Sequence, residues 1–159
     1  MKKETAVFAM GCFWQPDSLF SKIPGVIETA VGYIGGNEEY YPKPTYNQVC
    51  SGDTGYAEAV KIIFDSKKIS YKKLLEIFWN NHNPTTLNRQ GPDVGAQYRS
   101  AIFYTTEKQK KEAEESKKEK QKTLKNKIVT EITKASTFFP AEEYHQKYLE
   151  KRGLASCRI

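Results

Sequence analysis

The sequence predicts a single α+β domain, a two-layer sandwich with a central mixed β-sheet, and two observations support this. The chain has 159 residues, 38% of them hydrophobic, which is enough to bury one sizeable core but hardly two. Segments with strand character alternate with amphipathic helical segments, and no internal repeat or low-complexity linker interrupts them. Residues 1–159 are therefore expected to form one domain.

The first half of the chain contains three predicted strands and two predicted helices. They are, in chain order, a buried strand over 5–9, a short helix over 13–22, strands over 26–33 and 57–65, and an amphipathic helix over 70–82 capped by Ser70. A loop rich in tyrosine, proline and glycine, 37–55, lies between the second and third strands. Loops of this length are uncommon in compact domains unless they shape a site.

The second half begins with another polar loop and ends in a predicted helix. Its expected elements are the loop 83–100, a strand over 101–104, a lysine-rich helix over 107–127, a strand over 128–132 and a last helix over 140–149. The two long loops, 37–55 and 83–100, are where the chemistry is expected.

The net charge of +6 is concentrated in one segment. Residues 107–127 hold nine lysines and five glutamates, and no aromatic residue lies between them. Mixed charges at helical spacing describe a solvated helix face better than a phosphate-binding stripe, which would also need aromatic side chains for base stacking. The sequence therefore predicts no nucleic-acid partner.

The spacing of the cysteines and the lack of long apolar stretches predict a cytoplasmic location. The amino-terminal MKKETAVF lacks the apolar stretch of a secretory signal, and no segment approaches the ~20 apolar residues that span a membrane. The three cysteines Cys12, Cys50 and Cys157 are odd in number and widely spaced, unlike a disulfide framework or a zinc site. We expect a cytoplasmic chain without membrane association, with thiol chemistry in a reducing compartment.

Cys12, in the segment GCFW, stands where the first strand gives way to the first helix. Unpaired backbone N–H groups at a helix amino terminus stabilise a thiolate, so this position favours reactivity. The alternative is that Cys12 is a small buried hydrophobic residue, as most free cysteines are. Phe13 and Trp14 follow directly, and two rings beside a reactive sulfur would hold a methyl or thioether group, although core packing of one of them is a competing interpretation.

Five motifs in one order cover nearly the whole chain and resemble a known family. They are GCFW, GYIGG, PTYNQVCSGDTGYAEAV, NRQGPDVGAQYRS and PAEEYHQKYL. Together they resemble peptide methionine sulfoxide reductase A, which reduces the S epimer of methionine sulfoxide. The resemblance implies the fold of that family, a ferredoxin-like arrangement, and repair of oxidised proteins as the function.

The resemblance also implies roles for individual residues. Sulfoxide reduction needs a thiolate, an acid that protonates the sulfoxide oxygen, donors that hold this oxygen and an apolar surface for the methyl group. The implied residues are Cys12 as nucleophile, Glu58 as acid, Tyr46 and Tyr98 as donors, Asp93 as organising carboxylate, and Phe13 and Trp14 as the methyl-binding surface. Glu58 must stay protonated near neutral pH, which requires a partly apolar setting. On its own, Glu58 would more often be a surface carboxylate, and Tyr98 a half-buried strand residue.

Turnover needs a second thiol that condenses with the sulfenic acid left on Cys12. Cys157 lies in a carboxy-terminal tail, about 150–159, that we expect to be mobile enough to reach the site, although an inert tail thiol is the alternative. Cys50 could compete, but we expect it to be packed beneath its loop. The resemblance implies that thioredoxin or a similar dithiol recycles the Cys12–Cys157 disulfide.

No metal or organic cofactor is called for by this reaction. The expected substrates are proteins containing methionine sulfoxide, or free methionine sulfoxide, and a monomer is expected. Four positions depart from the family pattern, namely Gln15, Asp17, Tyr56 and Asn83. None of them removes a chemical group that the mechanism needs, but Gln15 and Tyr56 bear on the rate and on local hydrogen bonding.

Two interpretations from other functional classes remain open at this point. A cysteine hydrolase would pair Cys12 with His82 or His145 as base, and it would turn over esters or amides without a reductant. A non-catalytic module would bind oxidised or methionine-rich peptides through the aromatic rings. That module would neither form methionine nor consume dithiothreitol.

Overall fold

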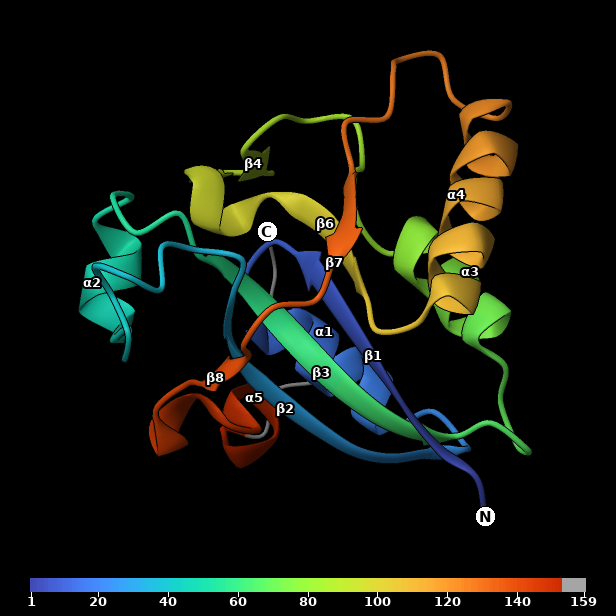
Figure 1. Ribbon diagram of the computed structural model, residues 1–159, viewed down its shortest axis with the longest axis horizontal. Helices are drawn as coiled ribbons and strands as arrows, with labels where there is room; N and C mark the ends of the chain where they lie inside the picture. The colour runs from blue at the N-terminus through green and yellow to red at the C-terminus, as the bar shows by residue number, and fades with distance from the viewer. Residues whose placement is uncertain (153–159) are drawn as a thin grey trace.

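A six-stranded sheet forms the centre of the computed structural model, which describes residues 1–152 (Figure 1). The strand order is β7-β6-β1-β3-β2-β8. The strands are β1 Lys3–Met10, β2 Val26–Ile34, β3 Ala57–Asp65, β6 Ser100–Tyr104, β7 Glu131–Lys134 and β8 Phe139–Pro140. All neighbouring strands are antiparallel except β6 and β7, which are parallel. The expected α+β fold with a mixed sheet is confirmed.

Side chains alternate between the two faces of β1, as the pleat of a strand requires. Ala6, Phe8 and Met10 join the larger core cluster, which the helices cover. Val7 and Ala9 point to the opposite face, where a smaller cluster includes Phe103 of β6. Because both faces are covered, β1 is buried from Ala6 to Met10, and its carboxyl end leads directly into the residues that follow.

Three helices cover the larger core cluster, and each begins where the sequence predicts. They are α1 Trp14–Ser21, α3 Tyr71–Asn80 and α4 Glu107–Gln121. The Ser70 hydroxyl caps α3 by accepting a hydrogen bond from the Lys73 backbone N–H at 3.1 Å. Trp79 of α3 donates through Nε1 to Ser116 Oγ of α4 at 2.9 Å, which joins the two helices.

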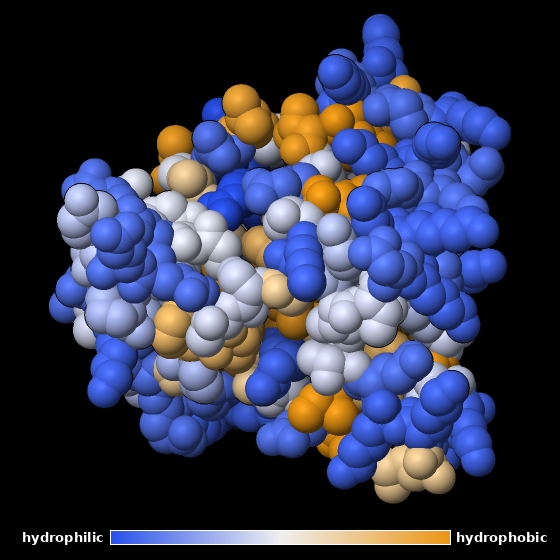
Figure 2. Space-filling view, in the orientation of Figure 1, coloured by the Kyte–Doolittle hydropathy of each residue, from blue (hydrophilic) through white to orange (hydrophobic). Residues whose placement is uncertain are grey.

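The lysine-rich helix α4 has the solvated character that its charges predict. Only Gln109 and Ala113 are buried on it. Figure 2 shows an almost uniformly hydrophilic surface over this helix, at the right of the view. The helix ends at Gln121, earlier than the expected 127, and β7 begins at Glu131, three residues after the expected 128.

Both long loops contain short elements that the sequence did not predict. The loop 37–55 contains the helix α2 Tyr46–Cys50. The loop 83–100 contains a separate hairpin, β4 Arg89–Gln90 with β5 Asp93–Val94, and the 3₁₀ turn η1 Ala96–Tyr98. These elements hold four of the residues expected in the site or beside it, namely Tyr46, Cys50, Asp93 and Tyr98.

The expectation of a continuous last helix over 140–149 is wrong. The segment instead forms β8, the 3₁₀ turn η2 Glu143–His145 and the short helix α5 Tyr148–Lys151. Its polar groups bond to β2 rather than along a helix, because the Gln146 amide exchanges two hydrogen bonds of 2.9 Å with the backbone of Val31. Lys147 has a left-handed backbone with φ of 54°, which breaks the helical path.

Within residues 1–152 no helix is both long enough and apolar enough to cross a bilayer. Cys157 lies outside the described residues.

Candidate active site

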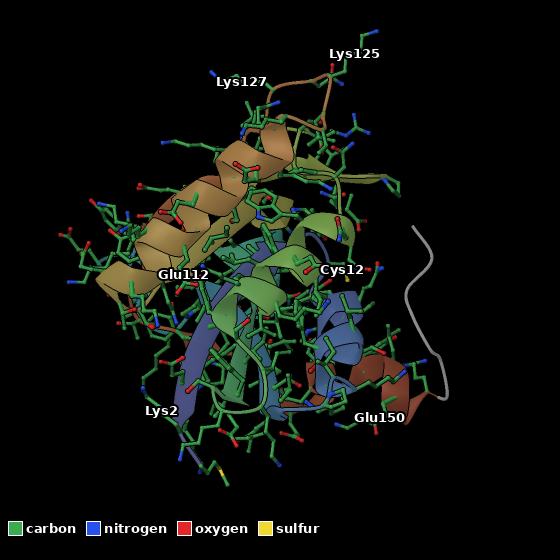
Figure 3. All side chains as sticks on the ribbon, turned by 90° about the vertical axis from the view of Figure 1, so that its right-hand side faces the viewer. Lys2, Cys12, Glu112, Lys125, Lys127 and Glu150 are labelled. Atoms are coloured by element: carbon green, nitrogen blue, oxygen red, sulfur yellow. The ribbon has the colours of Figure 1, made fainter. Side chains whose placement is uncertain are left out.

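Cys12 lies between the carboxyl end of β1 and the start of α1, at the labelled position in Figure 3. Gly11 makes the sharp turn with φ of 94°, and a Cβ atom there would lie 2.8 Å from the Gln90 side chain. Only glycine fits both the positive φ and this close approach. Cys12 is half-buried and directly precedes Phe13, the N-cap residue of α1. The predicted place of Cys12 at the amino terminus of this helix is therefore confirmed.

Glu58 lies on β3, where it pairs with Tyr33 of β2, and it is only 1% exposed. The backbone N–H of Phe13 donates to Glu58 Oε1 at 3.3 Å, which brings the carboxyl next to the residue after Cys12. Glu58 Oε2 is buried without a hydrogen bond to any described residue. A surface position for this carboxyl is therefore ruled out.

Burial raises the pKa of Glu58 to about 8, although the hydrogen bond from the Phe13 N–H acts in the opposite direction. The charge of Asp93 raises the pKa further, and the Gln97 amide has a smaller lowering effect. The carboxyl therefore keeps its proton near neutral pH, as the sequence analysis requires of an acid at this position.

The hairpin β4/β5 and the turn η1 bring Asp93 and Tyr98 to the same place. The Gln90 side chain fixes this loop through two bonds to the Asn83 backbone, Oε1 accepting at 2.7 Å and Nε2 donating at 2.9 Å. Burial raises the pKa of the Tyr98 phenol, and nearby negative charges add to this effect. Those charges belong, in decreasing order of effect, to Glu58, Cys50, Asp93 and Cys12.

Tyr46 begins the helix α2, which a reciprocal capping box fixes at its start. The Thr45 hydroxyl accepts from the Gln48 N–H, and the Gln48 side chain accepts from the Thr45 N–H. Burial raises the pKa of the Tyr46 phenol, and its hydrogen bond with Cys50, one helical turn along, raises it further. The loop 37–55 thus presents Tyr46 to Glu58 and Tyr98, which also raise its pKa.

The expectation that Cys50 is packed beneath its loop is wrong. Cys50 is exposed at the end of α2. The buried side chain of this short helix is that of Val49, because five residues present only one face to the protein.

Phe13 and Trp14 occupy different environments. Phe13 is 1% exposed and packs against Tyr33 with ring centroids 5.8 Å apart, so this ring belongs to the core. Trp14 is half-buried and stacks on Tyr148 of α5 with centroids 3.7 Å apart and an interplanar angle of 8°. Figure 3 shows α5, marked by Glu150, beside α1.

Two residues of the segment 141–147, Glu142 and His145, enter the site although the resemblance implies no role for either, and His145 was considered only as the base of a cysteine hydrolase. The Glu142 carboxylate accepts from the Tyr33 hydroxyl and from the Tyr46 N–H, both at 3.0 Å. The His145 ring lies 4.4 Å from the ring of Tyr46, and its Nδ1 accepts a hydrogen bond from Trp14 Nε1 at 3.1 Å. An acid and a histidine three residues apart on a short turn are too weak a pattern to have identified them.

Lys147 joins this segment to α1 through a partly buried ionic network. Its Nζ lies 3.0 Å from Asp17 Oδ1, and its backbone N–H donates to Asp17 Oδ2 at 2.9 Å. The same ammonium donates to the carbonyl and hydroxyl oxygens of Thr29 at 2.8 and 2.6 Å. Asp17, one of the departures from the family pattern, is 1% exposed and holds the segment beside α1.

Two of the other departures, Tyr56 and Asn83, fit their surroundings. Tyr56 is buried, donates to the Tyr41 carbonyl at 2.8 Å, and packs so closely on Gly36 that a Cβ atom there would lie 2.3 Å from its ring. Asn83 caps its own turn, because its side chain accepts from the Thr85 N–H at 3.0 Å. Nothing in the structure explains Gln15.

His82 is committed to a structural role. Its Nδ1 lies 2.7 Å from the Phe78 carbonyl and its Nε2 lies 2.7 Å from Ser100 Oγ. Burial lowers the pKa of His82 to about 4, which leaves the ring neutral at ordinary pH. In the described part of the chain, no cluster of three histidine, cysteine or carboxylate side chains has the arrangement of a metal site.

Comparisons with known proteins agree on one family. The model of the family described as "Peptide methionine sulfoxide reductase" matches residues 4–159. The protein "Peptide methionine sulfoxide reductase MsrA" of Methanosarcina acetivorans is 58% identical over 152 residues, which are 94% of this chain and 79% of that protein.

Solved structures give the same result. The reduced form of Mxr1 from Saccharomyces cerevisiae superimposes with a TM-score of 0.91 at 38% identity, over 96% of this chain and 87% of that one. Mxr1 in complex with Trx2 superimposes with a TM-score of 0.65 at 25% identity, over 92% of this chain and 85% of that one.

Proposed function

The chain belongs to the peptide methionine sulfoxide reductase family, and from this premise we infer that it is a peptide-methionine (S)-S-oxide reductase. It converts methionine S-sulfoxide to methionine at the expense of a thiol reductant. This membership disfavours the cysteine hydrolase and the non-catalytic binding module. His82 also lacks a free ring nitrogen for a hydrolase, since both of its nitrogens contact Phe78 and Ser100.

The first step transfers the sulfoxide oxygen to Cys12. The thiolate bonds to the sulfoxide sulfur, and Glu58 gives its proton to the sulfoxide oxygen. The resulting hydroxyl group then moves to the Cys12 sulfur as the S–O bond and the transient S–S bond break. The net result is methionine and a Cys12 sulfenic acid, so the sulfoxide is reduced by two electrons and the thiol is oxidised by two. Tyr46 and Tyr98 donate hydrogen bonds to the oxygen, and Asp93 helps to keep Glu58 protonated.

The substrate methyl group lies against Phe13 and Trp14 in this scheme. Phe13 is buried and so supplies the floor, while the half-buried Trp14 supplies the accessible ring. An apolar aromatic surface binds a methyl group next to a sulfur better than water does.

The second step regenerates the thiol. The Cys157 thiol attacks the sulfenic acid, water leaves, and a Cys12–Cys157 disulfide forms. A dithiol then reduces this disulfide by exchange. Thioredoxin is the partner that we infer for this step, because the related Mxr1 has been solved in complex with Trx2.

The remaining proposals concern the chain as a whole. We propose that residues 1–159 form one catalytic domain whose tail, about 150–159, carries the resolving cysteine. The enzyme acts as a monomer in the cytoplasm on free or protein-bound methionine sulfoxide, where a reducing environment maintains the thiols. The exposed ion pair of Lys122 with Glu119 at 3.1 Å, at the end of α4, supports a solvated surface rather than a nucleic-acid site.

The observation that carries this assignment is the buried carboxyl of Glu58, which accepts from the N–H beside Cys12 and has a pKa of about 8. A protonated acid next to a cysteine at a helix amino terminus suits reductive cleavage of an S–O bond.

A chirally resolved assay tests the proposed function. The wild-type chain is expected to convert the S epimer of a peptide methionine sulfoxide in the presence of dithiothreitol and to leave the R epimer unchanged. Cys12→Ser is expected to abolish the conversion, because a serine hydroxyl does not form the sulfenic acid. Conversion by Cys12→Ser above a blank without enzyme would contradict the assignment of the nucleophile.

A further inference from the structure

The side chain of His145 is a buried titratable group near the site that the proposed mechanism leaves without a task. It is 1% exposed, and its ring is surrounded by other rings. The ring centroids lie 5.2 Å from Phe13, 4.4 Å from Tyr46 and 4.1 Å from Tyr144. His145 therefore touches one ring from each of the two segments that present Cys12 and Tyr46.

The hydrogen bond from Trp14 determines the protonation state and the tautomer of the His145 ring. An indole nitrogen only donates, so His145 Nδ1 must accept, and the proton of the neutral ring is on Nε2. Burial lowers the pKa of His145, although the nearby Glu142 carboxylate acts in the opposite direction. A protonated ring would have two N–H donors and could not accept from Trp14.

The buried Nε2 of His145 carries an energetic cost, which argues that this side chain does more than fill space in the core. Nε2 is buried and makes no hydrogen bond within residues 1–152. A buried donor without a partner is destabilising, and a phenylalanine would fill the same aromatic environment without that cost. What histidine alone adds here is an acceptor for the indole of Trp14.

The hydrogen bond restricts the orientation of the Trp14 ring, because it ties the indole nitrogen to a side chain that is itself 1% exposed. Tyr148 stacks on one face of Trp14, and the ion pair of Lys147 with Asp17 holds this whole segment to α1. The two residues that set the orientation of Trp14, His145 and Tyr148, therefore belong to one short segment, which the ion pair of Lys147 with Asp17 holds to α1.

We propose that His145 is a positioning residue, which orients Trp14 for the methyl group of the sulfoxide and supports the ring of Tyr46 beside it. The proposal rests on the proposed function, because it takes Trp14 as the methyl-binding ring. His145 transfers no proton in the reaction and acts only through Trp14 and Tyr46.

Two variants separate the acceptor from the ring. His145→Phe keeps an aromatic ring and removes the acceptor, whereas His145→Asn removes the ring and keeps an oxygen at the position of Nδ1. We expect His145→Phe to raise KM for a methionine sulfoxide peptide about five-fold with little change in kcat, the size of one lost hydrogen bond. We expect His145→Asn to recover most of that loss.

The indole resonances give a second readout that does not depend on activity. The chain has two tryptophans, and Trp79 donates to Ser116, far from His145, so its resonance is an internal reference. In ¹⁵N-labelled protein, the Trp14 indole N–H signal is expected to move upfield in His145→Phe and to return toward its original position in His145→Asn. The Trp79 signal is expected to stay in place in both variants.

A double-mutant cycle identifies the route of action. In a Trp14→Phe background, His145→Phe is expected to have little further effect on KM, because the donor is already absent. An unchanged KM in His145→Phe, or additive effects of the two substitutions, would overturn the proposal. If wild type itself fails to reduce the sulfoxide, the proposed function fails instead, and the indole signals still test the hydrogen bond.

A measurement on wild type covers the case in which His145→Phe does not fold. The ¹⁵N shifts of the His145 ring are expected to show a neutral Nε2–H tautomer at neutral pH, with Nδ1 unprotonated. An Nδ1–H tautomer would contradict the proposal, because that nitrogen could not accept from Trp14.

Discussion

The Phe13 backbone N–H donates to Glu58 Oε1 across 3.3 Å and joins the start of α1 to β3. The helix whose amino terminus carries Cys12 is thereby tied directly to a carboxyl that is 1% exposed. The two residues are 45 positions apart in the sequence, so only the antiparallel pairing of β1 with β3 brings them together. The nucleophile and its acid are therefore positioned by the two central strands of the sheet.

Glu58 is expected to lower the stability of the protein as pH rises. Its pKa is about 8 in the folded protein and near 4.5 in an unfolded chain. Between these values the unfolded chain loses the proton and the folded protein keeps it, so the free energy of unfolding falls as pH rises. The maximum effect is roughly 5 kcal/mol, from 1.36 kcal/mol for each pKa unit.

Glu58→Gln removes this titration and keeps the shape of the side chain. The free energy of unfolding of the variant minus that of wild type is expected to increase between pH 5 and pH 8 and to level off above it. Urea unfolding at a series of pH values measures this difference. A difference that stays constant across the series would show that the carboxyl is ionised in the folded protein.

The ion pair of Lys147 with Asp17 is expected to be a major contribution to the stability of the carboxy-terminal segment. Lys147→Met leaves the Asp17 carboxylate buried without its cation, which costs roughly 2–4 kcal/mol, since the lysine is partly exposed. Chemical denaturation gives this value.

The matched control for that substitution is Lys151→Met. Lys151 pairs at 3.6 Å with Glu143, whose side chain is 90% exposed, so the change is expected to be about 0.5 kcal/mol or less. Equal losses from the two substitutions would mean that burial of Asp17 does not matter to the folded state.

Cys157 is expected to be needed for recycling and not for the first step. Cys157→Ser should release about one equivalent of methionine per enzyme, because that step needs only Cys12 and its acid. Turnover with thioredoxin should collapse, whereas dithiothreitol should restore part of it by reducing the sulfenic acid directly. A burst assay with each reductant makes the comparison.

Cys50→Ser is the control for the resolving cysteine. Because Cys50 is exposed and contacts Tyr46, it is a realistic alternative partner for Cys12. Peptide mapping of the oxidised enzyme is expected to show a Cys12–Cys157 link. A Cys12–Cys50 link in Cys157→Ser, together with full thioredoxin turnover, would identify Cys50 as the partner.

The sequence predicts the sheet and the main helices because their signals are local. The apolar strands, the Ser70 cap and the amphipathic stripe of α3 each depend on neighbouring residues, and all three are present in the structure. The resemblance also pointed to residues that lie within electrostatic reach of one another, since the charge of Glu58 raises the pKa of both Tyr46 and Tyr98, and the charge of Asp93 raises that of Glu58 and of Tyr98.

The segment 141–152 could not be predicted, because its structure depends on distant partners. Gln146 bonds to Val31 and Lys147 bonds to Asp17, residues more than 100 positions away. These contacts replace the helix that local propensity favours. The contacts that Glu142 and His145 make in the site could not be predicted for the same reason, since they depend on distant residues and not on sequence neighbours.

The single-turnover rate of methionine formation as a function of pH tests the central claim most directly, with wild type and Glu58→Gln compared at saturating sulfoxide. In wild type the rate is expected to decline as pH rises through about 8, because Glu58 then loses the proton that it must donate. Glu58→Gln is expected to react roughly 10²- to 10⁴-fold more slowly and without this decline, while binding the substrate similarly. A wild-type rate in Glu58→Gln, or the same decline above pH 8 in both proteins, would contradict the role of Glu58 as the acid that works with Cys12.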